Sequence, residues 1–208
     1  MKLIPALLSA TAAFAFSSTL ALADEPERLV LEGLSLQMTE TQVRAAMQAQ
    51  HFEQVGGEGA PLKYHSSFEQ LVAIKSADPE KFEIYQSTAE LRFENDNGHL
   101  VIGFMPFVNE TVVTSVVFFP SNVPWMQRTF PNCHKFADET RQKYGVPKGE
   151  NSPSHFRLKA PMEFGGQMKP DGQIISTNCS PRFNANIRLY NPYARDLLVQ
   201  QIDNALLE

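Results

Sequence analysis

Residues 91–119 read LRFENDNGHLVIGFMPFVNETVVTSVVFF, and they carry the clearest signal of fold class in the chain. Apolar and β-branched residues fill three runs, and the polar stretches 95–98 and 109–110 separate them. Strands joined by such short turns are typical of an antiparallel meander. Because both faces of the later two runs are apolar, we expect other elements to cover this sheet.

Capping boxes predict two helices before the meander. Thr39 and Gln42 have the spacing of a capping box, in which each side chain accepts a hydrogen bond from the backbone N–H of the other residue. Ser67 and Gln70 have the same spacing. The predicted helices span 39–50 and 67–75.

A second round of helix and then strands follows the meander. Gly145 and Pro147 end a predicted helix that starts near Asn132, because glycine suits the position after a helix end and proline bars continuation. Asp171-Gly172 is predicted to turn between short strands, and Asn191-Pro192 to start a terminal helix. The short strands are expected at 156–158, 174–176 and 186–190.

This order of elements predicts an α+β protein. We expect an antiparallel β-sheet with helices packed on one face, followed by a C-terminal helix. Residues 24–208 are expected to form a single domain, since a chain of this length suits one core. The repeated order leaves open two related helix-then-strands halves, about 24–120 and 121–208.

The N-terminus has the three parts of a secretory signal peptide. Lys2 is the only charged residue before Asp24, the residues between them are mostly apolar, and Ala21 and Ala23 are small. Serine and threonine dilute the apolar run, which distinguishes residues 1–23 from a membrane anchor. We therefore expect cleavage near Ala23-Asp24 and a mature chain that is periplasmic or secreted in a Gram-negative bacterium.

Cys133 and Cys179 are the two cysteines of the chain. A pair of cysteines in an oxidising compartment usually forms a disulfide. The alternative is a reactive thiol at Cys133 beside His134, but adjacent residues on a helix point about 100° apart. We predict a structural disulfide, which stabilises the fold by up to roughly 4 kcal/mol in the chain-entropy model.

Charge and hydropathy exclude several partners. The formal net charge is −5 at pH 7, whereas nucleic-acid binding requires a basic face, so no nucleic acid is expected. After residue 23 no segment is long and apolar enough to cross a bilayer, so no transmembrane segment is expected in the mature chain. The glycine-rich stretch 56–61 lacks the Lys-Ser/Thr of a phosphate loop, and we expect no cofactor.

Catalytic and metal-binding motifs are not recognisable. The histidines form no His-x-x-x-His pair, and the chain has no Cys-x-x-Cys, Gly-x-Ser-x-Gly or Ser-x-x-Lys motif. The sequence therefore predicts no catalytic, cofactor-binding or metal-binding residue. The alternative is a hydrolase whose catalytic residues are dispersed in the sequence, such as His65, His99 or His155 with a nearby serine or aspartate. The five histidines are His51, His65, His99, His134 and His155.

Four aromatic residues, Phe118, Phe119, Trp125 and Phe130, crowd the link between the meander and the later helix. Aromatic side chains are enriched at the centres of protein interfaces, so these residues form a candidate interaction patch. The alternative is that they seal the junction between two halves, because large aromatic side chains are usually buried.

One family resemblance follows from LEGLSLQMTETQV at 31–43, which precedes an alanine-rich helical turn and His51-Phe52. It resembles the GxxLGMTxxEVxxAL…GF opening of many uncharacterised secreted proteobacterial proteins. A related opening marks the SmpA/OmlA domain of BamE, and the plan is similar to the α/β repeats of the β-lactamase inhibitory proteins. KYGVP at 143–147 looks like the KYGxP that closes a later helix in those secreted proteins. The resemblance implies a noncatalytic interaction module.

The sequence thus predicts a soluble, noncatalytic periplasmic protein that binds or inhibits a protein of the cell envelope. A periplasmic hydrolase with dispersed catalytic residues is the alternative, and a purely structural or stress-related envelope protein is a third hypothesis.

Overall fold

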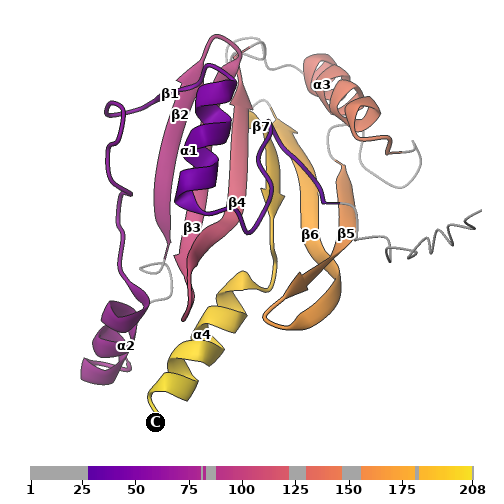
Figure 1. The fold of residues 1–208 in the computed structure, drawn as a ribbon. Helices are drawn as coiled ribbons and strands as arrows, with labels where there is room; N and C mark the ends of the chain where they lie inside the picture. The colour runs from indigo at the N-terminus through magenta and orange to yellow at the C-terminus, as the bar shows by residue number, and fades with distance from the viewer. Residues whose placement is uncertain are drawn as a thin grey trace, which may run out of the picture.

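Seven antiparallel strands form one sheet with the order β1-β2-β3-β4-β7-β6-β5 (Figure 1). The structure is a computed structural model that describes residues 28–80, 82, 88–121, 130–146, 156–180 and 183–207. The predicted signal peptide lies outside these residues. In chain order the elements are α1 (Glu40–Ala49), β1 (Glu53–Gln54), α2 (Phe68–Ala77), β2 (Ala89–Asn95), β3 (Gly98–Pro106), β4 (Thr111–Pro120), α3 (Phe130–Lys143), β5 (Arg157–Phe164), β6 (Gln167–Ser180), β7 (Phe183–Tyr190) and α4 (Ala194–Ala205).

The meander predicted from residues 91–119 is present as β2, β3 and β4. Its first turn lies between Asn95 and Gly98, and the backbone N–H of Asn97 donates to Asn95 Oδ1 over 2.9 Å. Gly98 has φ +150°, and a Cβ there would lie 2.3 Å from the carbonyl oxygen of Phe119. Only glycine fits this position, which explains how the sequence sets the turn and the register of β3.

The second hairpin turns at a different place from the predicted one. β5 and β6 are joined at Gly165 and Gly166, whose φ angles of +58° and +73° suit a two-residue hairpin turn. Asp171-Gly172, predicted as the turn, lies inside the long strand β6. A Cβ on Gly172 would lie 2.8 Å from Met162 on β5, so the glycine permits close strand approach there.

The two meanders are joined through their last strands. β4 pairs with β7 from Ser115↔Tyr190 to Phe118↔Ile187, so β2–β4 and β5–β7 form one continuous sheet. The larger buried cluster includes Ile102 from the first meander and Ile175 from the second. The helix-then-strands order thus occurs twice, and the two occurrences share a core.

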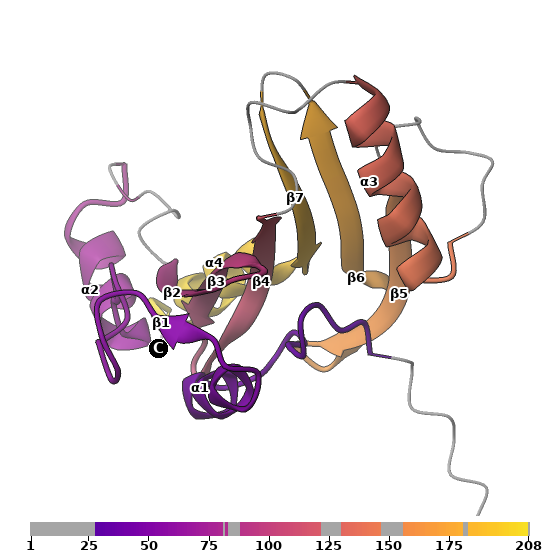
Figure 2. The same cartoon turned by 90° about the horizontal axis from the view of Figure 1, so that it is seen from above.

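The helices lie on both sides of the sheet. Val43 and Met47 of α1 and Phe136 of α3 belong to the larger buried cluster, whereas Leu71 of α2 and Leu198 of α4 belong to a second cluster. Figure 2 shows α1 on one side of β2–β4 and α4 on the other. The prediction that helices pack on one face is therefore wrong for α2 and α4.

The physical reason lies at the end of β3 and the start of β4. Met105 and Val112 pair across these strands and point to the side opposite Phe104 and Val113. Both sides of the sheet are apolar at this end, so α2 and α4 cover the second side there. Figure 1 shows these two helices together at the lower end of the sheet.

Both predicted capping boxes are confirmed. Thr39 and Gln42 cap α1 reciprocally, and Ser67 and Gln70 cap α2 in the same way. These caps satisfy backbone N–H groups that the first helical turn leaves without partners.

The later helices begin elsewhere than predicted. α3 begins at Phe130, before Asn132, while Gly145 follows its end with φ +64° as expected. α4 begins at Ala194 with Tyr193 as N-cap, rather than at Asn191-Pro192. The Asn191 side chain instead accepts from the Tyr193 backbone N–H over 2.7 Å, so it shapes the turn that precedes the helix.

The predicted disulfide joins Cys133 of α3 to Cys179 of β6, with 5.3 Å between the Cα atoms. Both residues are buried in the larger cluster. The bond therefore anchors α3 to the second meander at a distance of 46 residues along the chain.

Candidate functional site

Strand pairing aligns a row of side chains on the face of the sheet opposite α1 and α3. Within each strand these residues alternate with members of the larger buried cluster. We call this side, beyond the end covered by α2 and α4, the outer face. The line, named here the arginine row, runs across six strands as Arg92, Val101, Val117, Arg188, Ser176 and Arg157.

The arginine row has an apolar centre and charged ends. Val101 and Val117 pair directly across β3 and β4 and are half-buried. The side chains of Arg92, Arg157 and Arg188 are exposed. An apolar centre with a polar rim, and enrichment in arginine, are typical of protein interfaces.

Two of these arginines contact the same tyrosine. Arg157 donates from Nη2 to the Tyr190 hydroxyl over 2.5 Å, and the Arg188 guanidinium lies 4.7 Å from the centre of the Tyr190 ring. Within the described residues neither guanidinium forms an ion pair with a carboxylate. The Arg157–Tyr190–Arg188 cluster therefore holds two positive charges close together on the outer face.

Another cation of the outer face, Arg92, already has an anionic partner. It forms an ion pair with Glu90 on the same strand, with 2.6 Å between Nη2 and Oε1. This charge is locally neutralised, which separates Arg92 from the two arginines at Tyr190.

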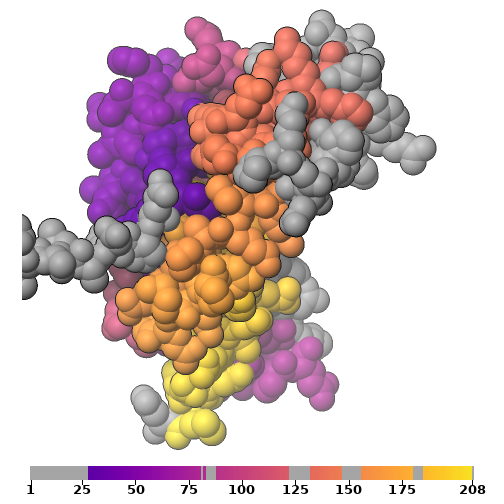
Figure 3. All heavy atoms as spheres, turned by 90° about the vertical axis from the view of Figure 1, so that its right-hand side faces the viewer, coloured from indigo at the N-terminus to yellow at the C-terminus, as the bar shows by residue number. Residues whose placement is uncertain are grey.

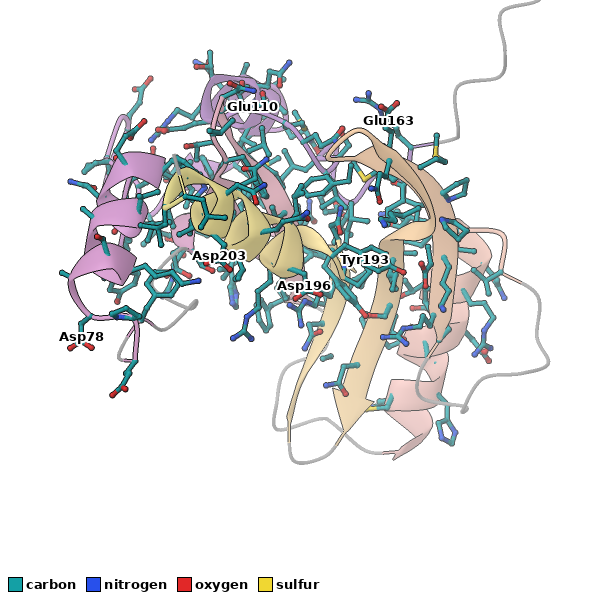
Figure 4. The ribbon with its side chains drawn as sticks, turned by 90° about the horizontal axis from the view of Figure 1, so that it is seen from below. Asp78, Glu110, Glu163, Tyr193, Asp196 and Asp203 are labelled. Atoms are coloured by element: carbon teal, nitrogen blue, oxygen red, sulfur yellow. A yellow bond between two sulfur atoms is a disulfide. The ribbon has the colours of Figure 1, made fainter. Side chains whose placement is uncertain are left out.

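Lys159 is paired as well, through a small network that reaches α4. Its ammonium group lies 3.2 Å from Asp171, which also accepts from the Tyr193 hydroxyl over 2.5 Å. The hydrogen bond from the Tyr193 hydroxyl is the main cause that lowers the pKa of Asp171, followed by the hydrogen bond from Lys159. The Tyr193–Asp171 hydrogen bond also raises the pKa of Tyr193. Figure 4 shows Tyr193 at the start of α4, beside the β5–β6 strands.

The sequence-predicted aromatic patch is not a single surface. Phe118 is 6% exposed and lies in the larger buried cluster, whereas Phe119 lies on the outer face and stacks on His99 with 4.5 Å between ring centres. Neighbouring residues of a strand point to opposite faces, so Phe118 cannot join Phe119 in a patch. Trp125 and the side chain of Phe130 lie outside the described residues.

Each histidine within the described residues lies in a different segment of the fold: after α1, in the loop before α2, on β3 and on α3. His51, His65 and His99 are exposed and His134 is half-buried, and no hydrogen bond from any of them to a carboxylate or hydroxyl is present in this part of the chain. No group of three potential metal ligands is found among these residues either. His155, part of the hydrolase hypothesis, lies outside them.

A second candidate is a hollow of about 660 Å³ between α1, β1 and the glycine-rich loop. Phe52 and Phe93 form its apolar floor. Arg44, on its rim, donates to Glu40, to Gln54 and to the carbonyl oxygen of Ala60. These bonds hold the loop against α1, so the polar groups of the rim serve the fold.

The sequence contains part of the signal for the outer-face cluster. Arg188 and Tyr190 are two residues apart in the predicted strand 186–190, so they share a face. Arg157 lies in the predicted strand 156–158, but its approach to Tyr190 depends on the pairing of β5, β6 and β7. The sequence alone therefore does not reveal the cluster.

Within the described residues no helix is long and apolar enough to cross a membrane. Scans against protein-family models, curated proteins and solved structures gave no match to the chain.

Proposed function

We propose that this protein is a noncatalytic binding module of the bacterial cell envelope, and that it docks a partner protein on the outer face of its sheet. The observation that carries the proposal is the arginine row, in which a pair of valines lies between exposed arginines. Arginine and tyrosine are enriched among the residues that dominate binding energy at interfaces. Tyr190 adjoins the row, and Phe119 supplies a further aromatic side chain on the same face.

Export is part of the proposal. The signal-peptide pattern of residues 1–23 supports it, and so does the buried Cys133–Cys179 disulfide, since such bonds persist in oxidising compartments. The resemblance of residues 31–43 to BamE-type and β-lactamase-inhibitory-type openings supports an interaction module of the envelope, and inhibition is one form that the interaction takes in this proposal.

The test compares two double variants of the chain in capture from envelope extract. Val101→Gln/Val117→Gln makes the centre of the outer face polar without changing its charge. Ala45→Gln/Ala49→Gln makes the same kind of change on the exposed side of α1. We expect the unaltered protein and the α1 variant to capture the same envelope protein, identified by mass spectrometry, and the outer-face variant to lose it.

Circular dichroism and thermal unfolding of both variants serve as folding controls. If the outer-face variant is folded and still captures the same protein, docking on the outer face is wrong. If the unaltered protein captures nothing after in-cell cross-linking, the binding function is wrong.

A further inference from the structure

The charge balance at Tyr190 points to the chemistry of the partner. Arg157 and Arg188 contact one phenol, and no carboxylate of the described residues pairs with either. Two guanidinium groups held together repel each other, and an anion placed between them relieves that repulsion. Arg157 uses Nη2 for the tyrosine and Arg188 uses its flat face, so among the described residues the other N–H donors of both groups have no hydrogen-bond partner and can bind an anion.

We propose that Arg157, Tyr190 and Arg188 form an anion site that receives a carboxylate side chain of an acidic partner protein. The inference rests on the proposed function, because it names the chemistry of the partner that docks on the outer face. Guanidinium groups bind carboxylates through paired N–H···O bonds with fixed geometry. Ser176 lies between the two arginines in the strand register and adds a hydroxyl to the same site.

The surroundings of the site favour a protein over an anionic membrane or a nucleic acid. Glu94 lies on the same face as the arginine row, and its negative charge repels an extended anionic surface. The adjacent valine pair offers an apolar contact that a phosphate backbone does not use. Membrane-binding patches usually gather four or more cations, whereas the described residues show an unneutralised pair at this site.

The direct test measures binding of a fluorescently labelled octaglutamate peptide to the mature chain by anisotropy at low salt. Arg157→Gln/Arg188→Gln removes both charges of the site. Lys135→Gln/Lys143→Gln removes two charges from α3, on the opposite side of the sheet, and serves as the matched control. We expect the first variant to lose about tenfold or more in affinity and the second less than about twofold, since charge-assisted hydrogen bonds dominate such contacts.

Further measurements identify the source of the anion. Inorganic phosphate and phosphatidylglycerol vesicles should compete weakly with the peptide, and sedimentation should show no self-association that depends on Arg157 and Arg188. Equal loss of affinity in both double variants, or equal binding of phosphate or vesicles, would overturn the acidic-protein site. Self-association that the first variant abolishes would assign the site to a second copy of this acidic chain instead.

The two proposals fail separately. If envelope capture fails while octaglutamate binding still depends on Arg157 and Arg188, the docking function is wrong and the anion site remains. If capture depends on the valine pair while both double charge variants bind octaglutamate equally, the function remains and the anion site is wrong.

Discussion

Gly98 lies where β3 begins, directly under the backbone of β4. Its φ is +150°, and a Cβ at this position would lie 2.3 Å from the carbonyl oxygen of Phe119, so there is no room for a side chain. Gly57 differs, because its φ is +96° but no atom lies within 4 Å of the place that its Cβ would take. Substitution of Gly57 therefore adds only an unfavourable φ, whereas substitution of Gly98 adds a steric clash as well.

Gly98→Ala is expected to lower the free energy of unfolding by roughly 3 kcal/mol or more, since it adds a clash with backbone to an unfavourable φ. Gly57→Ala should cost only about 1 to 2 kcal/mol, because it adds the unfavourable φ alone. Urea unfolding of the two variants makes the comparison. Equal losses would contradict the proposed role of close strand approach at Gly98.

A pH titration tests the hydrogen bond between Tyr193 and Asp171. The pKa of Asp171 is lowered in the folded protein, mainly by the Tyr193 hydroxyl and then by Lys159. Its contribution to stability is therefore present above the unfolded pKa of about 3.9 and is lost as pH falls through the folded pKa.

Tyr193→Phe should raise the pKa of Asp171 toward its ordinary value, because the strongest hydrogen bond to the carboxylate is removed. The carboxyl ¹³C chemical shift, followed as a function of pH, reports this pKa directly. Tyr64→Phe is the control, since Tyr64 is 76% exposed. An unchanged Asp171 pKa in the Tyr193 variant would show that the hydroxyl does not stabilise the carboxylate.

The disulfide gives α3 a covalent link to the sheet. The α3 side chains of Cys133 and Phe136 belong to the larger buried cluster, and Cys133 is bonded to β6. Lys143, near its end, forms an ion pair of 2.8 Å with Glu32, but exposed ion pairs contribute little to stability. The disulfide and the apolar contacts therefore hold α3 on the sheet.

Cys133→Ala/Cys179→Ala is expected to lower the free energy of unfolding by about 2 to 4 kcal/mol, because the bond closes a long loop in the unfolded chain. Urea unfolding with and without a reductant measures the effect. The reductant should destabilise the unaltered protein and leave the double variant unchanged. If the reductant has no effect on the unaltered protein, the disulfide does not stabilise this fold.

For the whole molecule, the pairing of β4 with β7 is the decisive contact. It aligns Val117 of the first meander with Arg188 of the second, and so it makes one outer face from two groups of strands. Figure 3 shows the β5–β6 hairpin between α3 above and α4 below. The carboxylate site proposed at Tyr190 lies in the second meander, and the apolar valine pair beside it lies in the first.

Structural features that depend on a few neighbouring residues can be predicted from the sequence. The capping boxes at Thr39 and Ser67, the turn before Gly98 and the glycine after α3 were all predicted at the correct residues. The disulfide was predicted from compartment and cysteine count. The turn predicted at Asp171-Gly172 is wrong, because these residues lie inside β6, where the glycine permits the close approach of β5.

The sequence by itself determined the α+β class, the meander, the helix caps and the cysteine pair, because each depends on neighbouring residues or on composition. Only the tertiary structure decided the joining of β4 to β7, the placement of α2 and α4 on the second side, and the approach of Arg157 to Tyr190. The physical reason is that strand pairing between distant segments depends on the free energy of the whole packed core. No short stretch of the chain contains that information.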